Sequence, residues 1–120
     1  MIIYNETFIV EESIAPNWLK WIKDNHIPAI LDTGFFDSYK VMTVLDSPNE
    51  GITYCFQYYT DSIERYSPFY YKHREKFHQL HNAQFENQFV LFTTLMESVD
   101  EMWFEKFWLK PDCVVYYSPT

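Results

Sequence analysis

Glycine is nearly absent from this sequence: only Gly34 and Gly51 occur among 120 residues. A glycine-rich phosphate loop, a dinucleotide-binding fingerprint and a nucleophile elbow each need several closely spaced glycines. None of these motifs can be written with two isolated glycines. The sequence therefore excludes the large enzyme classes that depend on them.

Cysteine and long apolar runs are also scarce. The only cysteines, Cys55 and Cys113, form neither a disulfide framework nor a metal-ligand spacing, which favours two buried free thiols. No apolar run approaches the about 18 residues of a membrane span, and the first residues lack the basic and apolar regions of a signal peptide. A cytoplasmic location is the expectation.

Positive charge is outweighed by negative charge. The chain carries 9 Lys+Arg against 17 Asp+Glu, a formal net charge of −8. A field of this sign repels polyphosphate backbones and anionic lipid headgroups. Neither nucleic acid nor a membrane surface is expected as a partner.

What the sequence does have is apolar and aromatic residues: 48% are hydrophobic and 21% are aromatic. This composition is typical of a packed globular protein, and 120 residues are enough for one domain with a modest extension. Alternating apolar residues predict strands over 2–10, 35–45, 52–60 and 88–97, and helical spacing predicts helices from about residue 15 to 31 and from about 61 to 82. Pro28 predicts an end or kink of the first helix near His26, and Pro68 a kink in the second.

The order strand, helix, strand, strand, helix, strand is that of the split βαβ pattern. It predicts an α+β, ferredoxin-like domain over residues 1–97, with a four-stranded antiparallel sheet and both helices on one face. Residues 98–120 form an aromatic C-terminal extension, for which the pattern predicts a helix over 100–110 and a short strand over 113–117.

Two helices can cover only one face of this sheet, yet the predicted strands are apolar on both faces. The third strand has Tyr54, Phe56 and Tyr58 on one side and Cys55 and Tyr59 on the other. A monomer would expose a large aromatic face, so we expect a homodimer of the dimeric α+β barrel type in which two such faces press together. We expect the extension to pack across the dimer, the alternative being that it folds back on its own subunit. Its aromatic residues include Trp103, Phe107, Trp108 and Tyr116.

The sequence resembles a small bacterial family of ferredoxin-like domains that is classed as a domain of unknown function. The resemblance covers about residues 1–97, and its most specific part is the run WLKWI at 18–22 followed by HIP at 26–28. It implies the fold but no activity. The other matching stretches are MIIYN at 1–5, TYCFQY at 53–58, HNAQF at 81–85 and FVLFTTL at 89–95.

More distantly, the predicted architecture is similar to the dimeric α+β barrels that include antibiotic-biosynthesis and haem-degrading monooxygenases. The haem-degrading enzymes use an asparagine on the first strand, a tryptophan, and a histidine on the second helix that ligates iron. Asn5 and either His78 or His81 could fill two of these places. No tryptophan lies in the third strand or the second helix to fill the remaining one.

Four residues are the candidate ligand-binding site: Asn5, His26, Tyr54 and His81. If the first and third strands run parallel, both helices end at the same edge of the sheet, and these side chains meet there. Such a group could orient a small anionic or carbonyl-bearing ligand, with an imidazole as acid or base. The alternative is that each histidine only complements the negative end of its helix dipole.

Other arrangements carry less chemistry. His78 and His81 share a helix face at i, i+3, but two ligands do not make a metal site, and no CxxC or HExxH motif accompanies them. We therefore expect no metal, no cofactor and no catalytic residue. The tyrosines of residues 58–71 could line an aromatic pocket, the alternative being that they belong to the core and the dimer interface.

The sequence thus predicts a cytoplasmic small-ligand binding or interaction domain that acts as a homodimer without catalysis. The alternative is a monooxygenase-like or haem-handling enzyme with a pocket between helices and sheet.

Overall fold

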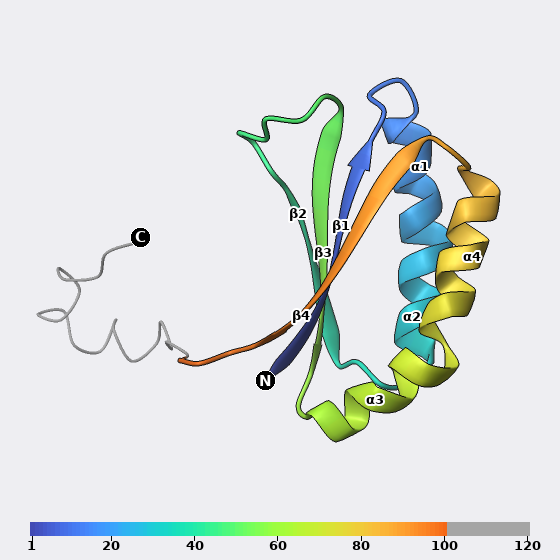
Figure 1. Cartoon of the computed structure of the whole chain (residues 1–120). Helices are drawn as coiled ribbons and strands as arrows, with labels where there is room; N and C mark the ends of the chain where they lie inside the picture. The colour runs from blue at the N-terminus through green and yellow to red at the C-terminus, as the bar shows by residue number, and fades with distance from the viewer. Residues whose placement is uncertain (101–120) are drawn as a thin grey trace, which may run out of the picture.

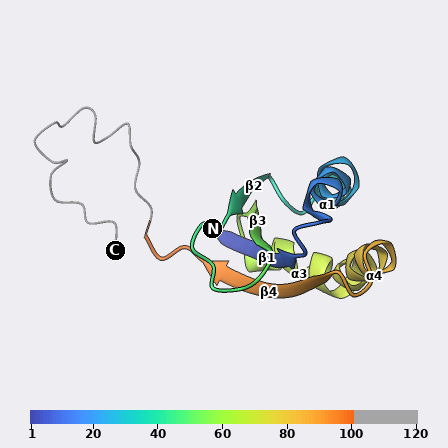
Figure 2. The same cartoon turned by 90° about the horizontal axis from the view of Figure 1, so that it is seen from above.

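The computed structural model describes residues 1–100, which form a four-stranded sheet with helices on one face (Figures 1 and 2). The predicted order of elements is confirmed. The helix expected over 100–110 and the strand expected over 113–117 lie outside the described residues, except for Asp100. The elements are β1 (Ile2–Val10), α1 (Ala15–Trp21), the π-helical segment η1 (Ile22–His26), α2 (Ile27–Asp32), β2 (Ser38–Thr43), β3 (Ile52–Thr60), α3 (Ile63–Lys72), α4 (Arg74–Gln84) and β4 (Phe89–Glu97).

The strands lie in the order β2-β3-β1-β4, and every neighbouring pair is antiparallel. In the β1–β3 pair, Ile2 is opposite Thr60 and Val10 is opposite Ile52. The prediction that the first and third strands run parallel is therefore wrong. In the sheet, β3 lies between β1 and β2. It runs antiparallel to both, so β1 and β2 run parallel to each other. The segments α1, η1 and α2 form a first helical arm, and α3 and α4 form a second. As a result of the strand directions the two helical arms run in opposite directions, and α4 ends near the end of the sheet where α1 begins (Figure 1).

The first helical arm continues through Pro28 instead of ending there. A proline cannot donate to the carbonyl four residues earlier, and its ring crowds that carbonyl. The chain widens into η1 just before the proline, where the Ile27 N–H donates to the Ile22 carbonyl, five residues back. This π-type turn lets the helix carry on to Asp32 and sets the direction of the His26 side chain at its last residue.

The second helical arm is broken at His73 and not at Pro68. Pro68 lies inside α3, whereas His73 leaves helical geometry with φ −126° and ψ −34° and separates α3 from α4. The N-terminus of α3 is capped by Ser62, whose hydroxyl accepts from the Arg65 N–H at 3.2 Å. The break lets α3 cross one end of the sheet while α4 runs beside the first helical arm (Figure 1).

The core lies between the helices and the inner face of the sheet. The alternation predicted for β1 is confirmed, because Tyr4, Phe8 and Val10 point toward the helices and are at most 1% exposed. Trp18 of α1 and Phe69 of α3 pack against them at 0% exposure. The outer face of the sheet has no helix over it in residues 1–100 (Figure 2).

Candidate functional site

A carboxylate lies in the middle of this core. Glu6 is on the inner face of β1, between Tyr4 and Phe8, and is 0% exposed. Its Oε1 is 2.8 Å from His26 Nε2, and its Oε2 accepts from the Tyr4 hydroxyl at 3.1 Å. His78 Nε2 lies 3.7 Å from Oε2 and 3.3 Å from the Tyr4 hydroxyl. We call Tyr4, Glu6, His26 and His78 the Glu6 cluster.

Glu6 is not among the predicted site residues, although its position in the strand carries a signal. The two-residue period that places Tyr4 and Phe8 on the inner face also places Glu6 there. A glutamate at an inward position must find partners, since a buried charge without them is very costly. An acidic residue on an otherwise apolar strand face therefore indicates a buried polar site, and Glu6 is such a residue.

The histidines keep Glu6 ionised. Burial on its own raises the pKa of this carboxyl, but the charge and hydrogen bond of His26, helped by His78, outweigh it and hold the pKa at about 2. For Tyr4, burial and then the charge of Glu6 raise the pKa of the hydroxyl well above its usual 10, although the nearby Arg74 opposes this. At neutral pH the Tyr4 hydroxyl therefore keeps its proton and donates a hydrogen bond to an ionised carboxylate.

His81 lies beside this cluster in a different state. Its Nε2 accepts a hydrogen bond from the Trp18 indole N–H at 2.8 Å, and its Nδ1 is buried with no hydrogen-bond partner within residues 1–100. Burial, followed by the charge of His26, lowers the pKa of His81 to about 4. The ring is therefore neutral at physiological pH.

The structure brings together only part of the predicted ligand site. The rings of His26 and His81 lie 6.0 Å apart between centroids, and the Tyr54 ring stacks on Trp18 at 5.3 Å. They meet because His26 lies midway along the first helical arm, not because both helices end at one edge. Asn5 lies on the outer face of the sheet, where its amide nitrogen donates to Thr7 Oγ1 at 2.9 Å. Alternation along β1 points the Asn5 side chain away from the helices, so it does not reach the histidines.

A small pocket opens beside the Glu6 cluster. Its volume is about 190 Å³, and Tyr4 links it to Glu6. Arg74, the first residue of α4, reaches into it and donates from Nη2 to Thr93 Oγ1 at 2.8 Å. We call this the Arg74 pocket. It is lined by Tyr4, Tyr66, Tyr70, Arg74, Thr93, Thr94 and Leu95.

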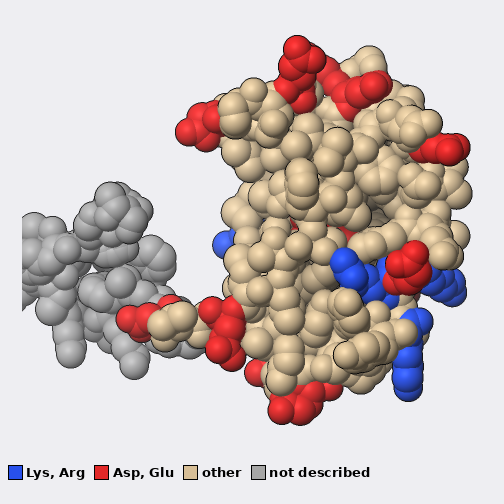
Figure 3. All heavy atoms as spheres, in the orientation of Figure 1, with Lys and Arg blue, Asp and Glu red and all other residues tan. Residues whose placement is uncertain are grey.

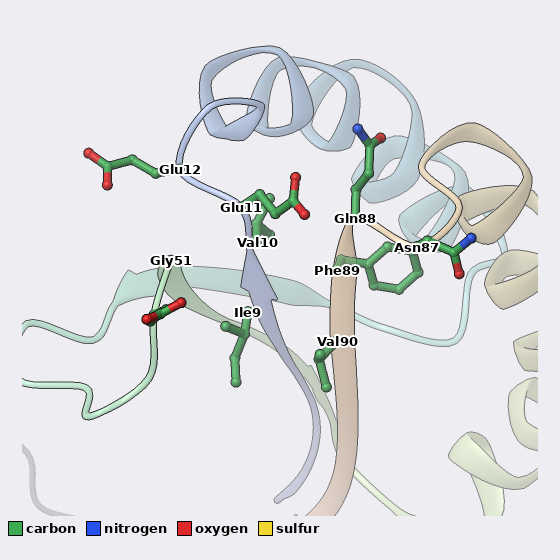
Figure 4. A pocket seen from close by; sticks show the side chains of 10 residues that line it. Ile9, Val10, Glu11, Glu12, Gly51, Asn87, Gln88, Phe89 and Val90 are labelled. Atoms are coloured by element: carbon green, nitrogen blue, oxygen red, sulfur yellow. The ribbon is translucent and has the colours of Figure 1, made fainter.

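A wider pocket of about 340 Å³ lies at the opposite end of β1 (Figure 4). Ile9, Phe89 and Val90 form an apolar part, and Glu11 and Glu12 lie at its rim. Acidic side chains gather at this upper end of the molecule (Figure 3). This pocket repels anions, in contrast to the Arg74 pocket.

No group of three or more His, Cys, Asp or Glu side chains among residues 1–100 is placed to hold a metal ion. No helix in the described part of the chain is both long and apolar enough to cross a bilayer.

The order of elements and the pairing of the strands define a ferredoxin-like α+β domain. Comparison with solved structures supports this fold. A crystal structure of an EthD (ethyl tert-butyl ether degradation) family protein from Bacillus halodurans has a TM-score of 0.59 and 16% identity, covering 82% of this chain and 100% of that one. At this identity the likeness concerns the fold alone. Residues 1–99 match DUF4286, a domain of unknown function, and the chain belongs to that family. No curated protein matches the sequence.

Proposed function

We propose that this domain acts in the cytoplasm as a homodimer that binds a small ligand in the Arg74 pocket without transforming it. The observation that carries the proposal is the contact between the pocket and the Glu6 cluster. Tyr4 lines the pocket and donates to Glu6, which His26 holds from the other side. A buried charged group with fixed partners gives a pocket a rigid, polarised wall. His26 is thus a positioning residue that acts on the pocket through Glu6 and Tyr4.

The size of the pocket limits the ligand. Sites for drug-sized molecules have volumes of about 300–1,000 Å³, whereas the Arg74 pocket, which is open to solvent, has a volume of about 190 Å³. The ligand is therefore a small metabolite with a single ring or a short chain.

The dimer half of the proposal rests on the outer face of the sheet. Phe92 is 56% exposed and Val90 is 49% exposed there, with nothing over them in residues 1–100. Asn5 Oδ1 is buried on the same face without a hydrogen-bond partner in the described chain. A second copy laid on this face would cover the apolar groups. The other apolar residues of this face are Ile3, Ile9, Met42, Cys55, Tyr59 and Met96. We propose that residues 98–120 pack on the core of their own subunit or on the partner subunit.

Phe92→Glu should convert the dimer to a monomer, because it places a charge in the proposed interface. Native mass spectrometry of the full chain reports assembly and any retained small molecule together. Leu80→Glu on α4 is the matched control, since Leu80 is 52% exposed but lies on a helix away from this face, and it should leave the dimer intact. A wild-type monomer, or a dimer that resists Phe92→Glu, would contradict the proposed interface.

A second candidate, a monooxygenase-like or haem-handling enzyme, is favoured by one observation. His78 contacts Tyr4 and Glu6, yet its side chain is 21% exposed, whereas His26 and His81 are sealed in the core. It is thus the one histidine of this group open to a ligand. A pocket of about 190 Å³ has no room for a haem without rearrangement.

Haem addition separates the two candidates. We expect no Soret shift when haem is titrated into the wild-type protein, because the Arg74 pocket is too small. A shift that His78→Ala abolishes and Leu80→Ala retains would favour the enzyme instead.

A further inference from the structure

Arg74 is a cation without a carboxylate partner in a chain rich in carboxylates. Within residues 1–100, the Lys and Arg side chains that form ion pairs with carboxylates are Lys20 and Arg65. Arg65, for comparison, binds both oxygens of Asp37 at 2.7 and 2.8 Å. Among residues 1–100, Arg74 forms no ion pair with a carboxylate, although it is half-buried. A partly desolvated guanidinium in this state favours an anion from outside the chain.

The contacts of Arg74 hold the guanidinium in place without using up its hydrogen-bonding capacity. Nη2 donates to Thr93 Oγ1, and the guanidinium carbon lies 5.0 Å from the centre of the Tyr70 ring. An arginine has five N–H donors in a planar fork that matches the two oxygens of a carboxylate. The packing on Tyr70 and the bond to Thr93 fix the plane of that fork in advance, which reduces the entropy lost on binding.

The neighbours of Arg74 decide which anion fits. Arg74 is the one cationic residue lining the pocket, and Glu6 lies just behind the Tyr4 wall. A dianion such as phosphate would meet one cation and one nearby negative charge. A monoanion needs only the single guanidinium. The Tyr4 hydroxyl already donates its hydrogen to Glu6, so the anionic oxygens belong at Arg74 and Thr93.

We propose that the Arg74 pocket binds a small monocarboxylate, with the carboxylate paired to the Arg74 fork and the body of the acid packed between Tyr66, Tyr70 and Leu95. This inference rests on the proposed function, since it names the ligand class of the same pocket. Three tyrosine rings and a leucine give the body of the ligand an apolar surround, which suits an aromatic or short aliphatic acid.

The test uses benzoate and propionate as probes, with benzamide and propionamide as neutral counterparts of the same shape. Binding to the full-length protein is followed by amide chemical shifts around residues 66–74 and 93–95. We expect both acids to bind wild type, and both amides to bind at least about tenfold more weakly, because a charge-assisted pair is worth roughly 1.5–3 kcal/mol. Arg74→Gln should weaken the acids by about tenfold or more. Arg65→Gln, which removes the other arginine outside the pocket, should leave them unchanged.

The possible results distinguish the carboxylate inference from the proposal that the Arg74 pocket is a ligand site. If acids and amides bind wild type equally well, or if Arg74→Gln binds acids as wild type does, the pocket is a ligand site but the carboxylate inference is wrong. If neither acids nor amides shift these signals at tens of millimolar, both the inference and the proposed ligand site are overturned. A thermal melt of Arg74→Gln that matches wild type shows that lost binding is not lost folding.

Discussion

Glu6→Ala should lower the free energy of unfolding by about 3–5 kcal/mol, the usual cost of removing one member of a buried ionic group. The carboxylate accepts from Tyr4 and binds His26 at 2.8 Å, and both partners are at most 3% exposed. Without Glu6, the Tyr4 hydroxyl and the His26 ring lose that partner in a region that water does not reach. Urea unfolding of the wild type and the variant measures the difference.

Glu86→Ala is the matched control, because Glu86 is exposed and lies between α4 and β4. Its effect should stay within about 0.5 kcal/mol. Glu6→Gln should fall between the two, since the amide keeps the shape and can still accept from Tyr4. Equal urea midpoints for Glu6→Ala and wild type would mean that the Glu6 cluster does not stabilise the fold.

The same carboxyl predicts part of the acid sensitivity of the domain. Its pKa is about 2 in the folded protein and 4.5 ordinarily, so the unfolded chain takes up the proton first as the pH falls. The stabilisation from Glu6 is therefore complete above about pH 4.5 and is lost as the pH falls toward 2. This loss of stability adds to a loss caused by His81, which begins at a higher pH.

The second large effect is a fall in stability between about pH 6.5 and pH 4 caused by His81. Its pKa is about 4 in the folded protein against an ordinary 6.5, so the unfolded chain again binds the proton first. Stability from this group is full above about pH 6.5 and is lost as the pH falls to about 4. The shift corresponds to a loss on the order of 2–3 kcal/mol.

His81→Gln removes this titration while keeping an oxygen that can accept from the Trp18 indole. Urea unfolding at pH 7.5 and at pH 4.5 should therefore show a smaller difference for His81→Gln than for wild type. Leu80→Gln controls for a glutamine on the exposed side of α4, and it should retain the wild-type difference. An unchanged pH dependence in His81→Gln would show that the proton is taken up elsewhere.

Local patterns were enough to find the elements of this fold. Alternation in residues 2–10 predicts β1, because successive strand side chains point to opposite sides. The proline at 28 correctly marks a disturbed turn, but not its form. Whether the chain stops or widens into a π-type turn depends on what the continuing helix can bury. Ile30, at 0% exposure beyond that turn, supplies the apolar contact that keeps the helix going.

The candidate site was predictable only in fragments. His26 and His81 were singled out, and they lie 6.0 Å apart, yet the strand directions used to bring them together were wrong. Asn5 was placed with them although strand alternation already separates it from Tyr4 and Phe8. Glu6 could have been found from that same alternation. Arg74 could not have been found in this way, because no nearby residue in the sequence indicates that Tyr4 and Thr93 will lie beside it.

The sequence by itself determined the class of fold and the succession of strands and helices, since each depends on residues within a few positions of one another. The tertiary structure alone decided the partners of Glu6, the state of His81 and the existence of the Arg74 pocket. These depend on β1, β4 and two helical arms meeting in space, with Tyr4 joined to His78 across 74 positions of sequence. Charges and hydrogen bonds act over a few ångströms of space, and only the folded chain determines which side chains come within that distance.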